Sequence, residues 1–441
     1  MFTNKDLKKL IIPLIIEQIL AVTVGMADGI MVARVGEAAV SGVSIVDSIS
    51  VLLIGLFSAL ATGGAVVSSQ FLGQKRNKEA SLAGEQLIMV SLALSLLITV
   101  ITLIGRYQIL NILFGDVEYD VMVNARIYFF YSALSYPFLA IYNGCAALFR
   151  SMGNSKISMK ISVIANILNV IGNAILIFGF NMGVAGAAIS TLVSRIFSSV
   201  MLLILISNKS LPIHIGNMLK FRPNMYLIKR ILKIGVPNGM ENSVFQVGKV
   251  LVQGIVASLG TSSITANSIS SNIGGFGVLP GSAIGLALIT VVGQCVGAGD
   301  YDGVKKYTKK LMKTTHIIMA GINLIIIFLI PSILKIYNVS DETAAIASTL
   351  MLYHCILSTI FWPPSFSLPN ALRAAGDVKF TMWISMISMW VWRIGFSYIL
   401  AIVFEMGVLG VWIAMTIDWV FRGACFVYRI SKEKYRTIAT L

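Results

Sequence analysis

The chain has 441 residues, of which 57% are hydrophobic and 12% are charged, and its mean hydropathy is +0.86. This composition excludes an ordinary soluble globular domain and indicates an integral membrane protein. The formal net charge of +15 would be typical of a nucleic-acid-binding protein if the chain were soluble. The placement of the basic residues along the chain decides between these two interpretations.

Twelve predominantly apolar stretches are each long enough to cross about 30 Å of hydrocarbon as a helix. A helix satisfies its own backbone hydrogen bonds inside a bilayer, whereas an isolated strand cannot. We therefore predict an all-α integral membrane fold with twelve transmembrane helices. The approximate spans are 10–34, 39–68, 82–104, 121–147, 158–180, 184–206, 231–258, 264–295, 311–333, 344–371, 380–403 and 407–429.

Lysine and arginine alternate between the connections that join these spans. With the N-terminus placed inside, 26 of them fall in inner segments, and only Arg34, Arg106 and Lys335 fall in outer loops. The positive-inside rule then predicts a multi-pass protein of the cell membrane with both termini in the cytoplasm. The basic charge reflects membrane topology, and we expect no nucleic-acid partner.

Motifs that would indicate an enzyme or a cofactor site are absent from the sequence. The four cysteines stand alone inside apolar spans, and no GxSxG, HExxH or P-loop pattern occurs. The N-terminal MFTNKDLKKLIIP lacks a small-residue cleavage site, so we expect a retained first span. We predict a protein that is not an enzyme and has no cofactor and no certain metal site.

The second half of the chain repeats features of the first half at an offset of about 224 residues. Pro13 and Glu17 correspond to Pro237 and Glu241, and MGVAG at 182–186 corresponds to MGVLG at 406–410. Six spans in each half would give both halves the same orientation, which is a parallel repeat typical of many transporters. We predict an N-terminal six-helix lobe at 1–206, a cytoplasmic linker at 207–230 and a C-terminal six-helix lobe at 231–441.

The repeat separates architecture from function, since a feature present in both halves is expected to be structural. Asp28 corresponds to Val252, and Lys249 corresponds to Gly25. A polar group that breaks the symmetry is a better candidate for binding a ligand. Glu17 and Glu241 form a matched pair, although Glu241 borders a polar stripe and could also serve a substrate.

Polar residues follow one face of the fifth and the seventh span. Their spacing of three and four residues places them along one side of a helix. Such a face would line a hydrated cavity, and hydrogen bonding between helices is the alternative. The two stripes are Ser162, Asn166, Asn169 and Asn173, and Asn238, Asn242, Gln246, Lys249 and Gln253.

Asp28 lies about eight residues, or about 12 Å, from the outer end of the first span. At that depth a carboxylate needs a proton, or a cation with other oxygen ligands, to offset its removal from water. Asp28 is therefore a candidate for ion coupling. A structural ion pair with Arg34 or Arg195 is the alternative, and Asp418 and Arg422, four residues apart on one helix, could pair with each other.

The segments MADGIMVARVG, FRSMGNSK and LIFGFNMGVAGAAISTLVSR, together with the repeat, resemble the bacterial multidrug and toxic compound extrusion (MATE) family over essentially the whole chain. The resemblance implies two six-helix lobes and antiport of organic, often cationic, compounds against H⁺ or Na⁺. It also implies ion coupling by Asp28 with Asn169, Asn173 and Thr191. Many relatives carry a second aspartate where this chain has Asn173, and the tenth span offers His354 where sodium-coupled members have an acid.

We predict a secondary active efflux transporter that exports organic, cationic or amphipathic compounds in exchange for H⁺ or Na⁺, and a Na⁺ ion at Asp28 is one form of this coupling. A flippase of lipid-linked precursors, which shares the superfamily fold, and a channel are the alternatives. The expected partners are small-molecule substrates and the lipid bilayer, and the expected state is a monomer. Candidate substrate or cavity residues are Asn166, Glu241, Asn242, Gln246, Lys249 and Gln253.

Overall fold

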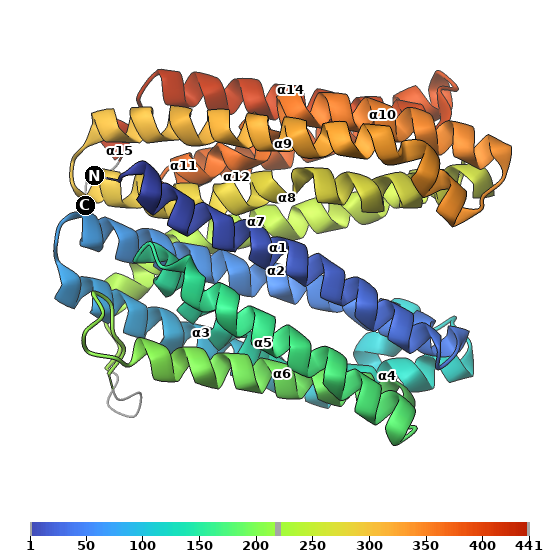
Figure 1. Cartoon of the computed structure of the whole chain (residues 1–441), viewed down its shortest axis with the longest axis horizontal. Helices are drawn as coiled ribbons and strands as arrows, with labels where there is room; N and C mark the ends of the chain where they lie inside the picture. The colour runs from blue at the N-terminus through green and yellow to red at the C-terminus, as the bar shows by residue number, and fades with distance from the viewer. Residues whose placement is uncertain (1, 217–221, 439–441) are drawn as a thin grey trace. The chain divides into compact units, whose positions relative to one another are not determined.

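The structure is a computed structural model that describes residues 2–216 and 222–438, so the predicted linker lies partly outside the described residues. Throughout these residues every regular element is a helix, and the all-α class is confirmed (Figure 1). The first half contains α1 (Asn4–Ala33), α2 (Glu37–Gly73), α3 (Asn77–Phe114), α4 (Tyr119–Ser151), α5 (Ser155–Asn173), η1 (Ala174–Gly179) and α6 (Gly183–Ile206).

The second half begins with α7 (Met225–Ala257), α8 (Thr261–Gly297), α9 (Tyr301–Tyr337) and α10 (Asp341–Trp362). The chain then passes through several short helical pieces, in which wider π-type turns interrupt the α-helix. These pieces and the final helices are η3 (Pro363–Ser367), α11 (Pro369–Ala374), α12 (Val378–Ser388), η4 (Met389–Gly395), α13 (Phe396–Tyr398), η5 (Ile399–Val403), α14 (Gly407–Ser431) and α15 (Tyr435–Ile438).

Ten helices in the described part of the chain are long and apolar enough to cross a membrane. This count joins α5 to η1, α10 to α11, and α12 to η5. The protein is therefore a multi-pass membrane protein. Helices α4 and α7 are each 33 residues long but more polar, and the total of twelve spans stays a prediction.

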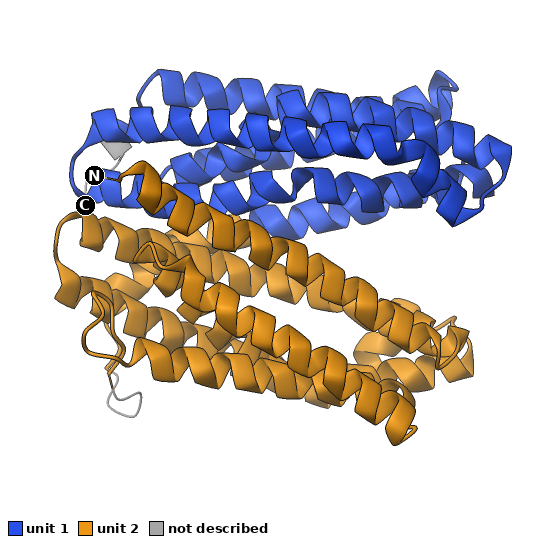
Figure 2. Cartoon of the chain, in the orientation of Figure 1, with its two compact units in different colours: residues 1, 240–441 blue, residues 2–239 orange. Residues whose placement is uncertain are grey.

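The chain forms two compact units, which Figure 2 shows in different colours. We call residues 2–239 the N-terminal unit and residues 240–441 the C-terminal unit. The division falls inside α7, whereas the predicted linker covers 207–230. The first part of α7 belongs to the N-terminal unit because it packs closely on α2, where the Ile231 carbonyl approaches Gly63.

The turns between helices recur at the offset of the sequence repeat. Gly36 and Gly260 precede α2 and α8 with φ of +143° and +95°. Asn181 and Glu405, which precede α6 and α14, have φ of +54° and +56°. A positive φ is uncommon for residues other than glycine. Its recurrence at Asn181 and Glu405 indicates that the same turn geometry enters the last long helix of each half.

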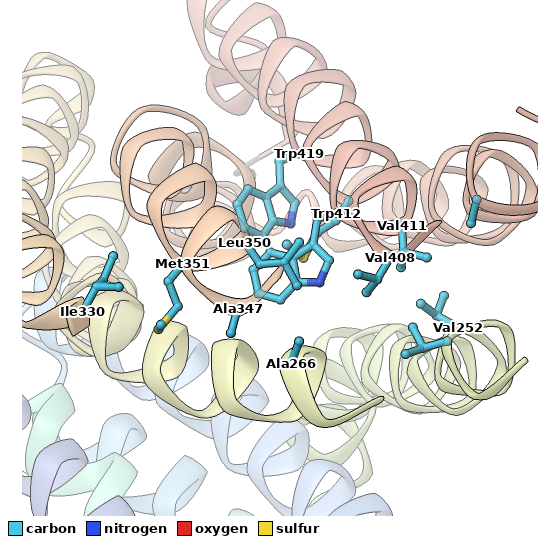
Figure 3. Close-up of a cluster of buried hydrophobic side chains, with 13 residues drawn as sticks. Val252, Ala266, Ile330, Ala347, Leu350, Met351, Val408, Val411, Trp412 and Trp419 are labelled. Carbon is cyan, nitrogen blue, oxygen red and sulfur yellow. The ribbon is translucent and has the colours of Figure 1, made fainter. Parts of the chain in front are cut away.

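An apolar core of the C-terminal unit surrounds two tryptophans of α14, Trp412 and Trp419, which are each 3% exposed. Figure 3 shows these rings beside Leu350 and Met351 of α10, with Val252 of α7 near Val408 and Val411. This core joins α7, α10 and α14 around an apolar centre.

The close contact between α2 and α7 predicts that a methyl group added at Gly63 lowers the stability of the protein. A Cβ atom at Gly63 would lie 2.5 Å from the Ile231 carbonyl oxygen, and backbone cannot move aside as a side chain can. Gly63→Ala should lower stability by about 1–3 kcal/mol, measured as a lower melting temperature of the purified protein in detergent.

Gly321→Ala on α9 is the matched control, because no atom lies within 4 Å of its Cβ position. Alanine has the higher helix propensity, so this variant should keep or slightly raise the melting temperature. Equal melting temperatures for Gly63→Ala and the wild type would contradict the close approach of α2 and α7.

Candidate functional site

The N-terminal unit encloses a cavity of about 800 Å³. Residues of α1, α2, α4, α5 and α6 line it, so five helices contribute to one site. Its wall combines apolar side chains with carboxyl, amide, hydroxyl and guanidinium groups. The ionisable or hydrogen-bonding residues that line the cavity include Glu17, Asp28, Asp47, Tyr128, Tyr142, Asn166, Asn169, Thr191 and Arg195.

Asp28 lies on α1, and its carboxylate is held by amide groups from α5. The Asn173 side-chain nitrogen donates to Asp28 Oδ1 over 2.6 Å. The Asn169 amide satisfies its neighbours when its nitrogen donates to Asp28 Oδ1 and Oδ2, at 2.7 and 3.2 Å, and its oxygen accepts from Thr191 Oγ1 at 3.2 Å. The structure thus brings together the four residues that the family resemblance assigns to ion coupling.

Close packing of α5 on α6 positions these amides. Ser190 Oγ of α6 donates to the Asn169 backbone oxygen over 2.7 Å. Gly172 allows the approach, because a Cβ atom there would lie 2.4 Å from Ser190 Oγ. Asn169 and Asn173 are 4% and 0% exposed, so both are buried in the protein interior. Small residues at such a contact are typical of helix packing in membranes.

The remaining members of the fifth-span stripe also face the cavity. Ser162 and Asn166 line it, and the buried Asn166 amide nitrogen has no hydrogen-bond partner among the described residues. Ser162, Asn166 and Asn169 therefore lie on one wall of the cavity, as the helical periodicity predicts. Asn173 is fully buried and reaches the site through its hydrogen bond to Asp28.

Asp47 of α2 is a second carboxylate on the cavity wall that the sequence analysis missed. Asp28 and Asp47 are close enough to repel each other electrostatically, and Arg195 of α6 attracts both. In the described residues no Lys or Arg nitrogen lies within 4 Å of Asp28, and Arg195 instead donates to Ser135 Oγ over 2.6 Å. The repeat could have identified Asp47, because its counterpart 224 residues later is Ser271.

The symmetry-related position of Asp28 has a different environment. Val252 is 8% exposed and belongs to the apolar core around Trp412 (Figure 3). The N-terminal unit therefore has an acid at the cavity where the C-terminal unit has a core side chain.

Glu17 and Glu241, the matched pair, are both buried, at 8% and 5% exposure. Glu17 accepts from the Tyr142 hydroxyl over 2.9 Å and from Ser158 Oγ over 3.3 Å. Glu241 instead forms ion pairs, with Arg373 at 2.7 Å and Arg422 at 3.5 Å. The partners of these two acids could not be read from the repeat, because they come from other helices.

Along α7, the predicted polar stripe lies in a more open environment. Gln253 accepts a hydrogen bond from Asn267 of α8 over 3.1 Å, and the Lys249 ammonium group lies 5.2 Å from the centre of the Phe245 ring. Gln246 and Asn242 are half-buried. In the described part of the chain, Gln246, Lys249 and Gln253 make no contact with a carboxylate like those that Asn169 and Asn173 make with Asp28.

The spacing of Asp418 and Arg422 suggested that they could pair with each other, but each forms an ion pair with another residue of the C-terminal unit. Asp418 lies 3.6 Å from Arg393 and accepts from Ser388 Oγ over 2.5 Å, while Arg422 pairs with Glu241. Asp418 and Arg422 therefore each bind a residue of another helix. Sequence distance along one helix could not show these partners.

The described part of the chain contains no group of three or more His, Cys, Asp and Glu residues arranged to hold a metal ion. Oxygen atoms at the Asp28 site come from one carboxylate, two amides and one hydroxyl. Such a set suits a proton or a hard monovalent cation better than a transition metal.

Comparison with known proteins identifies the class. A solved multidrug resistance MATE family transporter in an outward-facing conformation has the same fold, with a TM-score of 0.91 and 19% identity, covering 98% of this chain and 96% of that one. The two chains thus share a fold. The MatE family model matches residues 13–175 and 237–399, two ranges separated by the offset of the repeat, and the chain belongs to the MATE family of transporters.

Curated relatives extend over nearly the full length of the chain. It is 28% identical to an uncharacterized transporter, YisQ, of Bacillus subtilis (strain 168), with 93% of this chain and 90% of that protein covered. It is 25% identical to the probable multidrug resistance protein NorM of Thermotoga maritima, with 99% and 94% covered. The similarity thus includes both halves of the chain.

The buried ion pairs of Glu241 predict a strong effect on stability. Arg373→Met leaves Glu241 with one more distant partner, so it should destabilise the protein by about 3–5 kcal/mol. The measurement is the melting temperature of the detergent-purified variant. Glu241→Gln combined with Arg373→Met should recover part of the loss, since the uncompensated carboxylate is then absent.

Arg76→Met is the control for removal of an arginine from an ion pair. Arg76 pairs with Glu79 at 2.8 Å on the exposed surface, where an ion pair contributes little. A melting temperature for Arg373→Met equal to that of Arg76→Met would show that the Glu241 pair does not support the fold.

Proposed function

We propose that the protein is a secondary active efflux transporter that exports organic cationic or amphipathic compounds in exchange for H⁺ or Na⁺. The observation that carries this proposal is Asp28, a carboxylate at membrane depth that lines a cavity and has no cationic partner within 4 Å among the described residues. Asn169, Asn173 and Thr191 supply the groups that respond to ion binding. We assign the coupling to this set.

A change in the protonation of Asp28 alters its hydrogen bonds with the Asn169 amide. When Asp28 is ionised, the amide nitrogen donates to the carboxylate. A protonated carboxyl has an O–H donor, and the Asn169 amide can accept it by rotating so that its oxygen faces Asp28. Thr191 can serve both orientations, since the Asn169 nitrogen can donate to Thr191 Oγ1 over the same 3.2 Å. Proton uptake would therefore rearrange the contacts between α1, α5 and α6.

Sodium would act at the same place by a different rearrangement. Two amide nitrogens point at the carboxylate when it is ionised. A Na⁺ ion requires oxygen ligands, so both amides would have to turn their oxygens inward. In either case the ion shifts the equilibrium between conformations only because it binds one of them more tightly.

The cavity of the N-terminal unit is suited to a small organic substrate. Its volume of about 800 Å³ is within the usual range for ligand pockets. Asp28 and Asp47 supply negative charge, and Tyr128 and the apolar residues of α1 and α2 supply surface for a hydrophobic body. Competition between substrate and ion for Asp28 would couple export to ion entry. Asn166, Glu241, Asn242, Gln246, Lys249 and Gln253 are the further residues that we assign to the substrate pathway.

The transport cycle that we propose is alternating access produced by motion between the two predicted six-helix lobes. The protein would act as a monomer in the cell membrane, with both termini in the cytoplasm. Its partners would be small-molecule substrates and lipid, and the coupling ion would take the place of a cofactor.

Replacement of Asp28 tests the coupling directly. In proteoliposomes, efflux of a cationic dye should follow an imposed pH gradient or, separately, an imposed Na⁺ gradient. Asp28→Asn keeps the size of the side chain but removes the ionisable group, so it should reduce gradient-driven efflux by an order of magnitude or more. Asp116→Asn is the matched control, because Asp116 is exposed in a loop.

The result for Asp28→Asn decides the assignment. Efflux at the wild-type rate under both gradients would exclude Asp28 as the coupling residue. Steady ion conductance without substrate exchange in the wild type would favour a channel over a transporter.

Asn173 provides a test of the coupling ion. Asn173→Asp places a second carboxylate at the atom that now donates to Asp28 over 2.6 Å. A Na⁺ ion between two carboxylates is held more tightly than one beside a single carboxylate, so Na⁺ should stimulate dye efflux at about tenfold lower concentration. Asn173→Leu, of similar size, should show no such gain. An unchanged Na⁺ dependence in Asn173→Asp would remove Asn173 from the ion site.

A further inference from the structure

The C-terminal unit contains a cluster of charged side chains, most of them buried, in which basic groups outnumber acidic ones. Four cations and two carboxylates interact with one another, and even with a neutral lysine the three arginines outnumber the acids, since arginine stays protonated. Excess charge of one sign is costly to bury. The cluster consists of Lys249, Arg373, Arg393, Arg422, Glu241 and Asp418.

Both carboxylates of the cluster already bind side chains of the protein. Glu241 lies between Arg373 and Arg422, at 2.7 and 3.5 Å. Asp418 accepts from Ser388 Oγ over 2.5 Å, and its distance to Arg393 is longer, at 3.6 Å. Arg393 therefore has only a weak counter-ion.

Unused donors remain on the arginines. Arg422 is 2% exposed, and its Nε and Nη1 atoms have no hydrogen-bond partner in the described residues. The Nε atom of Arg393 is buried and also lacks a partner there. Buried N–H groups of a guanidinium without acceptors are unfavourable, and an anion would satisfy them.

Lys249 adds a cation that a solute can reach. It is exposed on α7, its positive charge and that of Arg393 repel each other, and no carboxylate in the described range of the chain lies within 4 Å of its ammonium group. The nearby Phe245 ring, at 5.2 Å, attracts a cation but does not neutralise its charge.

Aromatic rings lie beside this group of cations. The Phe245 and Phe366 rings are 5.6 Å apart, and Trp362 stacks on Phe366 at 4.9 Å. Phe366 also packs against the Arg422 guanidinium at 4.4 Å. A flat apolar group could contact these rings while an acidic group reaches the cations.

We propose that Lys249 and Arg393 bind the anionic group, a carboxylate or sulfonate, of an amphipathic aromatic compound. The inference rests on the proposed transport function and specifies one substrate class for it: compounds that carry an acidic end. The C-terminal unit would hold that end, while the acids of the N-terminal unit respond to protons and cations. An inorganic anion such as chloride shares the required chemistry and is distinguished below.

The test is equilibrium binding to the full-length protein in lipid nanodiscs, measured by isothermal titration calorimetry. The probes are 2-naphthoate and its neutral counterpart 2-naphthamide. The wild type should bind 2-naphthoate more tightly than 2-naphthamide. Lys249→Gln should weaken 2-naphthoate binding about tenfold or more, because a charged partner is lost. Lys249→Arg should retain the affinity, and 2-naphthamide should be unaffected by either change.

Lys233→Gln is the control, since Lys233 is an exposed lysine at the other end of the same helix, and it should bind 2-naphthoate like the wild type. Binding needs no ion gradient, so failure of the Asp28 coupling test would leave this result intact. Displacement of 2-naphthoate by chloride in the wild type, with no chloride binding to Lys249→Gln, would support the anion site and identify an inorganic ion as an occupant. Equal affinity of the wild type and Lys249→Gln for 2-naphthoate, or no preference of the wild type for naphthoate over naphthamide, would overturn the proposal.

Discussion

The cost of keeping a charge away from water governs the arrangement of polar groups in both units. Each buried acid of the matched pair has its own set of donors: Glu17 binds two hydroxyl groups, whereas Glu241 binds two arginines. Asp28 is held only by neutral amides. Neutral donors stabilise a carboxylate without cancelling its charge, so Asp28 keeps the capacity to take up a proton or a cation. In the function that we propose, this difference separates a structural acid from one that responds to ions.

The repeat gives each half the same turns but not the same interior. Gly36 and Gly260 enter equivalent helices with positive φ, since backbone geometry is what a duplicated framework has to preserve. The side chains within that framework differ: Val252 packs in an apolar core at the position equivalent to Asp28. The acidic cavity of one unit and the surplus of basic groups in the other are the basis of our proposal that the two halves bind groups of opposite charge.

Site features that depend on a regular pattern within one helix could be predicted from the sequence. Features that depend on contacts between distant residues could not. Asn166, Asn169 and Asn173 follow one helix with regular spacing, so their common face could be derived from periodicity. Asn166 and Asn169 line the cavity, and Asn173 binds Asp28 beside it. Asp47 stands alone in α2, with no periodic partner, and was missed. The spacing of Asp418 and Arg422 suggested that they could pair with each other, yet both side chains form ion pairs across helices.

The sequence by itself determined the membrane class, the helical fold, the repeat and the asymmetry at Asp28, because hydrophobic length, helical period and residue identity are properties of local chain segments. Only the tertiary structure decided that five helices enclose one cavity, that the Asn169 amide serves Asp28 and Thr191 together, and that Glu241 binds Arg373. The hydrogen bonds and the ion pair among these contacts join residues that are 22 to 141 positions apart along the chain. Their formation depends on how helices pack, which no local pattern specifies.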